Sequence, residues 1–123
     1  MANGNAYVIE DTGSYVKFLL YEYDIGSYHL KPIHKSWLDK HVIAPWQYRK
    51  LEVQFTGYAS KGGSTEWNRT VAYNRASAAT NYVVNRGNIP VSNTYLGEPN
   101  LQEDDDPLQQ SGWRAVLVEV WYN

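Results

Sequence analysis

The stretch VQFTGYASKGGSTEWNRTVAYNRASAATNYV, residues 53–83, joins a strand pattern to a helix pattern through one short loop. Apolar and polar residues alternate over residues 50–58, which predicts a half-buried strand. A loop rich in Gly and Ser follows, and apolar residues at helical spacing then predict a helix from about residue 66 to 85, with Gly87 as its C-terminal stop. The stretch therefore predicts a strand–loop–helix unit in a fold that mixes strands with helices.

The flanking sequence supplies further strands and a second helix. Residues 28–46 carry apolar side chains at spacings of three and four, with Pro32 in the first helical turn and Pro45 marking the end of the helix. Alternating or extended patterns predict strands at 13–24, 91–99 and 113–123, and an extra edge strand at 6–10. The order β-α-β-α-β-β predicts an α+β sandwich, in which one mixed sheet of about four strands carries two main helices on one face.

The strand at 13–24 predicts an aromatic outer face. If the apolar set Val16, Phe18 and Leu20 faces the helices, the alternate set faces away from them, namely Tyr15, Leu19, Tyr21 and Tyr23. The C-terminal strand has apolar residues at both parities, as in a strand buried on both faces. The outer rings would then be covered by residues 6–10 or by the loop at 98–111, or would form a contact surface for a second copy or a partner protein.

Composition bounds the classes of function. The chain has 123 residues, the length of one domain, and its net charge of −2 gives no footprint for nucleic acid. It has no cysteine, which excludes thiol catalysis and disulfides. The N-terminal residues lack the pattern of a signal peptide, and no stretch has the roughly 18 apolar residues of a membrane span. The chain has eleven Tyr and five Trp but only two Phe. Because Tyr and Trp combine a large apolar ring with a polar group, this composition favours partly exposed surfaces and interfaces.

Four stretches, in this order, resemble the OmpA-like domain of bacterial envelope proteins. YEYDIGSYHLKPIHKSWLDKHV (21–42) is similar to the family's opening strand, Leu-x-Pro and first helix. Residues 53–83 resemble its Gly-aromatic-Thr-Asp and Asn-x-x-Leu-Ser-x-x-Arg-Ala motifs. RGNIPVSNTYLGEPN (86–100) and WRAVLVEVW (113–121) are similar to its Gly-Ile-Pro region and closing strand. The resemblance covers residues 16–122 of a single domain, 1–123, and leaves 1–12 as an N-terminal extension or extra edge strand.

The resemblance implies a site for the diaminopimelate of the peptidoglycan stem peptide. Asn68 and Arg75 stand where the family's motif has them, and the family pattern makes Arg114 a neighbour of the pocket. Ser60 occupies the position of the family's aspartate. An arginine fork suits a carboxylate, whereas an ammonium prefers a charged acceptor, which serine does not supply. The implied site is degenerate, and the missing aspartate should weaken binding by roughly ten- to a hundredfold.

Each candidate residue also has a structural interpretation. Arg75 shares a helical face with apolar residues, so its head group either contacts a ligand or bonds nearby carbonyls. Asn68 either serves the site or caps the helix, and Ser60 is also a common turn residue. Arg114 is either an exposed strand residue or part of the pocket.

Metal and catalytic sites are not predicted. His29, His34 and His41 are five and seven residues apart, which does not place two imidazoles on one ligand. The acidic run at 103–106 lacks the ligand spacing and glycine of an EF-hand calcium loop. No nucleophile motif accompanies the serines and histidines. We therefore expect no cofactor, no metal and no enzymatic activity.

Two functions follow as expectations. The first is a non-catalytic module that binds peptidoglycan with weakened or altered affinity, which the resemblance would place in the periplasm or cell envelope. The second is a protein–protein or assembly module of an envelope, secretion or phage-particle machine that has lost peptidoglycan binding. Without a signal peptide, a cytoplasmic chain or part of a delivered assembly fits the second function.

Overall fold

The computed structural model describes residues 3–59, 65–96 and 114–123. Its strands form one sheet in the order β1-β2-β5-β3-β4. The bounds are β1 Asn5–Asp11, β2 Tyr15–Tyr21, β3 Leu51–Tyr58, β4 Val91–Leu96 and β5 Ala115–Tyr122. All neighbouring strands are antiparallel except β3 and β4, which are parallel. The sheet is therefore mixed, as predicted.

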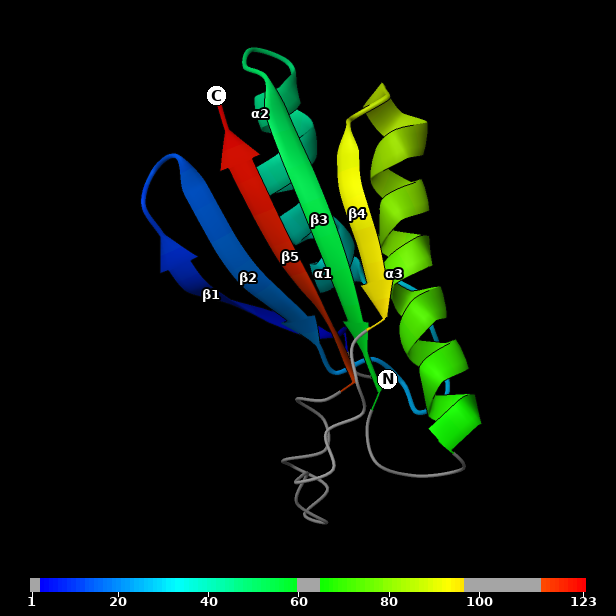
Figure 1. Cartoon of the computed structure of the whole chain (residues 1–123). Coiled ribbons are helices and arrows are strands. Elements are labelled where there is room, and N and C mark those ends of the chain that lie inside the picture. The colour runs from blue at the N-terminus through cyan, green and yellow to red at the C-terminus, as the bar shows by residue number, and fades with distance from the viewer. Residues whose placement is uncertain (1–2, 60–64, 97–113) are drawn as a thin grey trace.

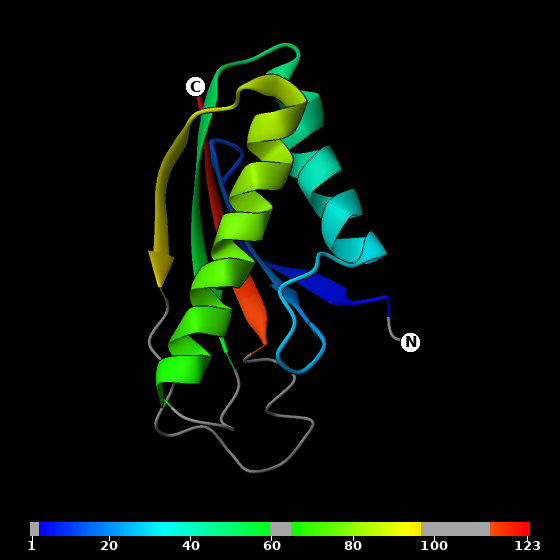
Figure 2. The same cartoon turned by 90° about the vertical axis from the view of Figure 1, so that its right-hand side faces the viewer.

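Two helical segments cover one face of this sheet (Figure 2). The first runs through α1 Pro32–Leu38, a π-helical segment η1 Asp39–Ile43 and α2 Ala44–Trp46. The second is the long α3, Thr65–Gly87. Figure 1 shows α3 beside β3 and β4, with the first helical segment behind the middle of the sheet. The predicted α+β sandwich with both helices on one face is confirmed.

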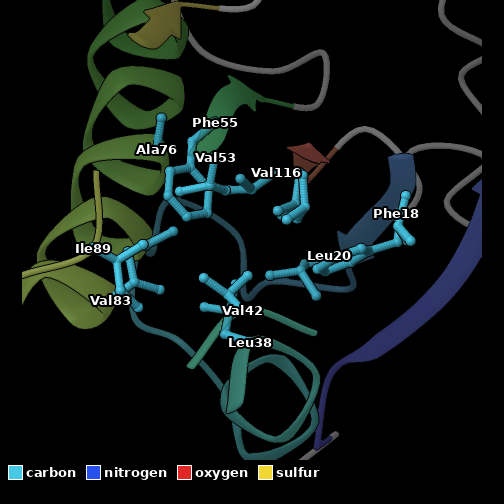
Figure 3. Close-up of a cluster of buried hydrophobic side chains, with 14 of the residues drawn as sticks. Phe18, Leu20, Leu38, Val42, Val53, Phe55, Ala76, Val83, Ile89 and Val116 are labelled. Atoms are coloured by element: carbon cyan, nitrogen blue, oxygen red, sulfur yellow. The ribbon is translucent and has the colours of Figure 1, made fainter. Parts of the chain in front are cut away.

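The core lies between the sheet and the helices (Figure 3). Strand side chains of one parity meet residues from both helical segments there, because alternate residues of a strand point to the same face. Fully or almost fully buried members include Phe18, Leu20, Leu38, Val42, Val53, Phe55, Val83, Val116 and Val118. The inward set predicted for 13–24, which includes Phe18 and Leu20, is thus correct.

Helix α3 lies unusually close to β3 at one point. A Cβ atom at Gly57 would lie 1.8 Å from the backbone oxygen of Ala72, so no larger residue fits there without moving the helix. Ala72 and Ala76 are both fully buried along this contact. The close approach brings the first half of α3 against the end of β3, where the candidate site lies.

The helix ends differ in detail from the prediction. Asn88, not Gly87, adopts the left-handed conformation after α3, with φ 53°. Asn is the usual alternative to Gly in this role. Gly87 is instead the last helical residue, and a Cβ there would lie 3.2 Å from the Trp46 ring. The left-handed residue after the helix is therefore one position later than expected, and Gly87 packs closely against Trp46.

The first helical segment ends at Trp46, one residue after Pro45, and contains a π turn in which the amide of Ala44 donates to the carbonyl of Asp39. Proline has no N–H, so it cannot donate to the carbonyl of His41 four residues earlier. The Tyr122 hydroxyl donates to that carbonyl instead. The last strand thus completes the hydrogen bonding of the helix.

The outer face of the sheet is only partly as predicted. Tyr15, Leu19 and Tyr21 are half-buried on the side away from the helices. The C-terminal strand is fully buried on its helix side from Val116 to Val120, whereas on its other side burial decreases along the strand, from Ala115 at 1% exposed to Trp121 at 37%. Residues 5–11 pair with β2 in the plane of the sheet and so extend it as an edge strand rather than covering these rings. The other predicted cover, 98–111, lies outside the described residues.

Candidate functional site

The candidate residues gather at one end of the sheet. Strands β2 and β3 end there, while β5 and α3 begin there (Figure 1). The strand register agrees, since Leu20 near the end of β2 pairs with Val116, and Tyr58 at the end of β3 pairs with Ala115. Segments that are distant in sequence therefore meet around the loop that leaves β2.

Arg75 is the buried centre of this end. It lies on α3, its side chain is 1% exposed, and all three nitrogens of its head group donate to backbone carbonyls. Nε donates to Ser27 at 2.7 Å, Nη1 to Tyr58 at 3.0 Å and Nη2 to Asp24 at 3.0 Å. The guanidinium thereby ties the loop after β2 to the end of β3.

Burial also changes the acidity of Arg75. Desolvation lowers the pKa of the guanidinium to about 10, and the nearby Arg114 charge adds to this effect, while Tyr23 opposes it. A pKa of about 10 still leaves Arg75 charged at neutral pH. The three carbonyl oxygens replace the water that this charge has lost.

Tyr23 lies in the core, not on the outer face, so the prediction for this residue was wrong. The Tyr23 ring stacks on the His34 ring with a centroid distance of 4.3 Å. The guanidinium carbon of Arg75 lies 5.2 Å from the centroid of the Tyr23 ring. The reason is local, because β2 ends at Tyr21 and Glu22 has a left-handed φ of 60°. This conformation breaks the alternation of the strand and turns the next side chain inward.

The Tyr23 hydroxyl is buried without a hydrogen-bond partner in the part of the chain that the structure describes. Burial raises the pKa of this phenol well above its usual value, so it stays neutral. An unpartnered hydroxyl in this position is costly, by about 1–3 kcal/mol.

Two charged groups lie at the surface of the same loop. Arg114 is half-buried, and its Nε donates to the carbonyl of Tyr23 at 2.7 Å. The Asp24 side chain is 61% exposed, and one carboxylate oxygen accepts from Lys31 Nζ at 2.6 Å. The hydrogen bond from Lys31 is the main cause that lowers the pKa of Asp24, and the Lys31 and Arg114 charges act in the same direction.

The structure brings two of the candidate residues, Arg75 and Arg114, to the same loop. Asn68 is buried on α3, seven residues before Arg75 and so on the same side of the helix, and Arg114 lies beside the loop that Arg75 holds. Ser60 lies outside the described residues. Sequence patterns did not predict Asp24 or Tyr23 as part of this site. The pattern indicated Asp24 only as the end of a strand and placed Tyr23 on the outer face of the sheet.

The three histidines do not converge. His34 is fully buried: its Nδ1 accepts from the Lys31 amide at 3.1 Å, so its Nε2 carries the proton to the Tyr21 carbonyl at 2.6 Å. Burial lowers the pKa of His34 to about 4. His41 packs on Phe18 with ring centroids 5.0 Å apart, and His29 is exposed. No group of three or more metal-ligating side chains occurs among the described residues.

In the described part of the chain, none of the helices is both long and apolar enough to cross a membrane.

Comparisons with known proteins place the fold. No family model matches the sequence, and no curated protein matches it significantly. Solved structures do match. The OmpA-like domain of FopA1 from Francisella tularensis is 17% identical with a TM-score of 0.60, over 98% of this chain and 83% of that one.

Two further structures cover most of both chains. The peptidoglycan-associated lipoprotein from Burkholderia pseudomallei is 19% identical with a TM-score of 0.61, over 85% of this chain and 89% of its own. The cell wall anchor of the T6SS from Pseudomonas aeruginosa is 13% identical with a TM-score of 0.65, over 96% and 88%. At these identities the likeness concerns the fold, and the fold of this chain is that of an OmpA-like domain.

Proposed function

We propose that this chain is a non-catalytic binding module for the peptidoglycan stem peptide. The observation that carries the proposal is that Arg75 and Arg114 both bond the loop after β2 at one end of an OmpA-like sheet, with Asn68 buried on the same side of α3 as Arg75. Two of the similar structures are named a peptidoglycan-associated lipoprotein and a cell wall anchor, which supports the same class of ligand. The proposed place of action is the bacterial cell envelope.

The chemistry of the ligand fits the charges at this end. The free amino-acid end of diaminopimelate carries an ammonium and a carboxylate, and arginine forks bind carboxylates well. Ser60 offers the ammonium only a neutral oxygen. We therefore expect weak binding, in a range that NMR titration detects better than a sacculus pull-down.

The experiment is a titration of ¹⁵N-labelled protein with meso-diaminopimelate, together with sedimentation of the protein with purified sacculi. Amide shifts confined to the Asp24, Tyr58, Arg75 and Arg114 region are the expected result. Ser60→Asp should tighten binding by roughly tenfold or more, because a charged acceptor replaces a neutral one. Ser14→Asp, in the exposed turn between β1 and β2, is the matched control. An absence of shifts at millimolar ligand in both the wild type and Ser60→Asp contradicts the proposal.

The outer face of the sheet supports a second candidate function, as an assembly module. Ring pairs lie on this face, Tyr7 with Tyr21 and Tyr15 with Trp121, each with centroids 5.5 Å apart. Tyr7 is 48% and Trp121 37% exposed, and the described helices lie on the opposite face. Aromatic side chains with polar tips are enriched in protein interfaces. A second copy of the chain is the partner that we propose for this face.

A further inference from the structure

Arg75 has little left with which to bind a ligand. Three of the five N–H groups of its guanidinium already point at the carbonyls of Asp24, Ser27 and Tyr58. At 1% exposure it is also nearly closed to solvent. Its evident task is to hold the loop after β2 in place, and the groups that contact the ligand have to be sought on the surface of that loop.

Arg114 donates fewer hydrogen bonds than Arg75 within the described part of the chain. Only its Nε has an acceptor among the described residues, the carbonyl of Tyr23. The two terminal nitrogens of this half-buried side chain have no acceptor within residues 3–59, 65–96 and 114–123. The backbone of Arg114 is fixed as well, since its carbonyl accepts from the Tyr23 amide at 3.2 Å. Within the parts of the chain described, one edge of the guanidinium is thus anchored while its terminal nitrogens are left open, which is the arrangement needed to bind a carboxylate.

Asp24 supplies an exposed negative charge next to Arg114. Its backbone carbonyl is held by Arg75, and its carboxylate is 61% exposed. Lys31 occupies one carboxylate oxygen, but an ionised carboxylate has about four acceptor sites. Arg114 lies near enough to stabilise the Asp24 charge. The carbonyls of the neighbours Tyr23 and Asp24 are therefore both held by arginines, and the Arg114 cation lies near the Asp24 anion.

We propose that Arg114 and Asp24 form the pair that recognises the charged head of the ligand, with the Arg114 terminal nitrogens on its carboxylate and the Asp24 carboxylate on its ammonium. The ligand is then a free amino-acid zwitterion, and Asp24, which already bonds Lys31, supplies part of the negative charge that Ser60 lacks. This inference rests on the proposed function. The surplus of positive charge from Lys31, Arg75 and Arg114 makes the carboxylate the more tightly held half.

The test compares two ligands and two substitutions. Pimelate is diaminopimelate without its amino groups, so it probes the carboxylate contact alone. Arg114→Gln should weaken the binding of both compounds by roughly ten- to a hundredfold, since it removes charged hydrogen bonds. Asp24→Asn should weaken diaminopimelate by roughly tenfold and leave pimelate unchanged or slightly tighter. Dissociation constants come from ¹⁵N amide shifts, and a dispersed spectrum shows that each variant is folded.

Matched controls remove an equal charge elsewhere. Arg69→Gln lies on the exposed side of α3, and Glu10→Gln lies on the edge strand β1. Both should bind as the wild type does. Arg114→Lys is the second variant if Arg114→Gln does not fold; it keeps the charge without the fork and should still bind several-fold more weakly.

The outcomes separate this inference from the function on which it rests. If the wild type and Ser60→Asp bind neither diaminopimelate nor sacculi, the proposed function fails and the inference with it. If the wild type binds diaminopimelate and both Arg114→Gln and Asp24→Asn bind it equally well, the function stands and the inference is overturned. If pimelate binds the wild type as tightly as diaminopimelate, the role of Asp24 is overturned.

Discussion

At the scale of single residues, Arg75 shows how a buried charge is accommodated by backbone rather than by an opposite charge. Its guanidinium has three carbonyl acceptors within 3.0 Å. Arg75→Met would remove all three bonds and leave the carbonyls of Asp24, Ser27 and Tyr58 short of donors. We expect a loss of about 3 kcal/mol or more in the free energy of unfolding, measured by urea denaturation. Arg69→Met on the exposed side of α3 should change it by less than about 0.5 kcal/mol, and an equal loss in both variants contradicts the assignment.

His34 should make stability depend on pH. Its pKa is lowered from 6.5 to about 4, chiefly by burial, so the unfolded chain takes up the proton first as pH falls. The stabilisation is fully present above pH 6.5 and is lost progressively down to pH 4, in total about 3 kcal/mol. His41, whose pKa burial also lowers, acts in the same direction.

The measurement is the free energy of unfolding from pH 7 to 5, a range in which most carboxylates stay ionised. The wild type should lose stability at up to about 1.4 kcal/mol per pH unit once the pH is well below 6.5. His34→Gln should show a clearly smaller slope, and His29→Gln, at an exposed position, should keep the wild-type slope. Parallel curves for the wild type and His34→Gln would show that His34 does not titrate differently in the two states.

At the scale of elements, the packing of α3 on β3 depends on a single missing side chain. The Cβ of Gly57→Ala would meet the carbonyl oxygen of Ala72 at 1.8 Å, and a backbone atom cannot move aside as a side chain can. We expect a destabilisation of about 3 kcal/mol, seen as a lower urea midpoint. Gly13→Ala is the control: nothing lies within 4 Å, but φ is +86°, so only about 1 kcal/mol of backbone strain is expected. A smaller effect at Gly57 than at Gly13 contradicts the close contact.

The π turn of the first helical segment allows a double-mutant cycle. Tyr122→Phe removes the only hydroxyl among the described residues that donates to the His41 carbonyl, and should cost about 1 kcal/mol. Pro45→Ala restores an N–H that can reach the same carbonyl within the helix. The loss from Tyr122→Phe should therefore be smaller in the Pro45→Ala background than in the wild type. Strictly additive losses, measured by thermal unfolding, would show that the two residues do not share this acceptor.

The sequence was sufficient to predict the strands and helices, but not the arrangement of charges in the loop after β2. The period of two in β2, β3 and β5 and the helical spacing in α3 are local, so patterning predicted them and their inward faces. The position of Tyr23 depends on the left-handed Glu22, and the exposed Asp24 is set by contacts with Arg75 and Lys31. The contact with Arg75 joins residues 51 positions apart, and the contact with Lys31 spans seven positions of an irregular loop, so no strand or helix pattern records either of them. The family motif predicted Asn68, Arg75 and Arg114 as site residues, but it did not point to Asp24, the acidic residue near Arg114.

At the scale of the whole molecule, helices cover one face of the sheet (Figure 2). Aromatic rings line the other face, where Tyr7 packs with Tyr21 and Tyr15 with Trp121. The edge strand β1 widens the ring-lined face, because Tyr7 pairs across to Leu19 and its ring packs against Tyr21. An antiparallel face of this kind normally carries polar residues. Its aromatic content is the reason to expect a contact between copies there.

Tyr21→Glu combined with Trp121→Glu tests that contact. Two charges placed among the rings should disfavour burial of this face against a second copy, so the wild type should be dimeric and the double variant monomeric by light scattering. Tyr48→Glu combined with Tyr73→Glu adds the same charge at rings that are 76% and 53% exposed elsewhere, and should stay dimeric. A wild type that is monomeric at every concentration examined, with stability unchanged by the first pair, rules out the contact surface. The proposed binding end of the sheet, where Arg114 and Asp24 lie, should respond to ligand equally in monomer and dimer, because Tyr21 contributes only its backbone carbonyl there, as the acceptor for His34, and the substitution leaves that carbonyl in place.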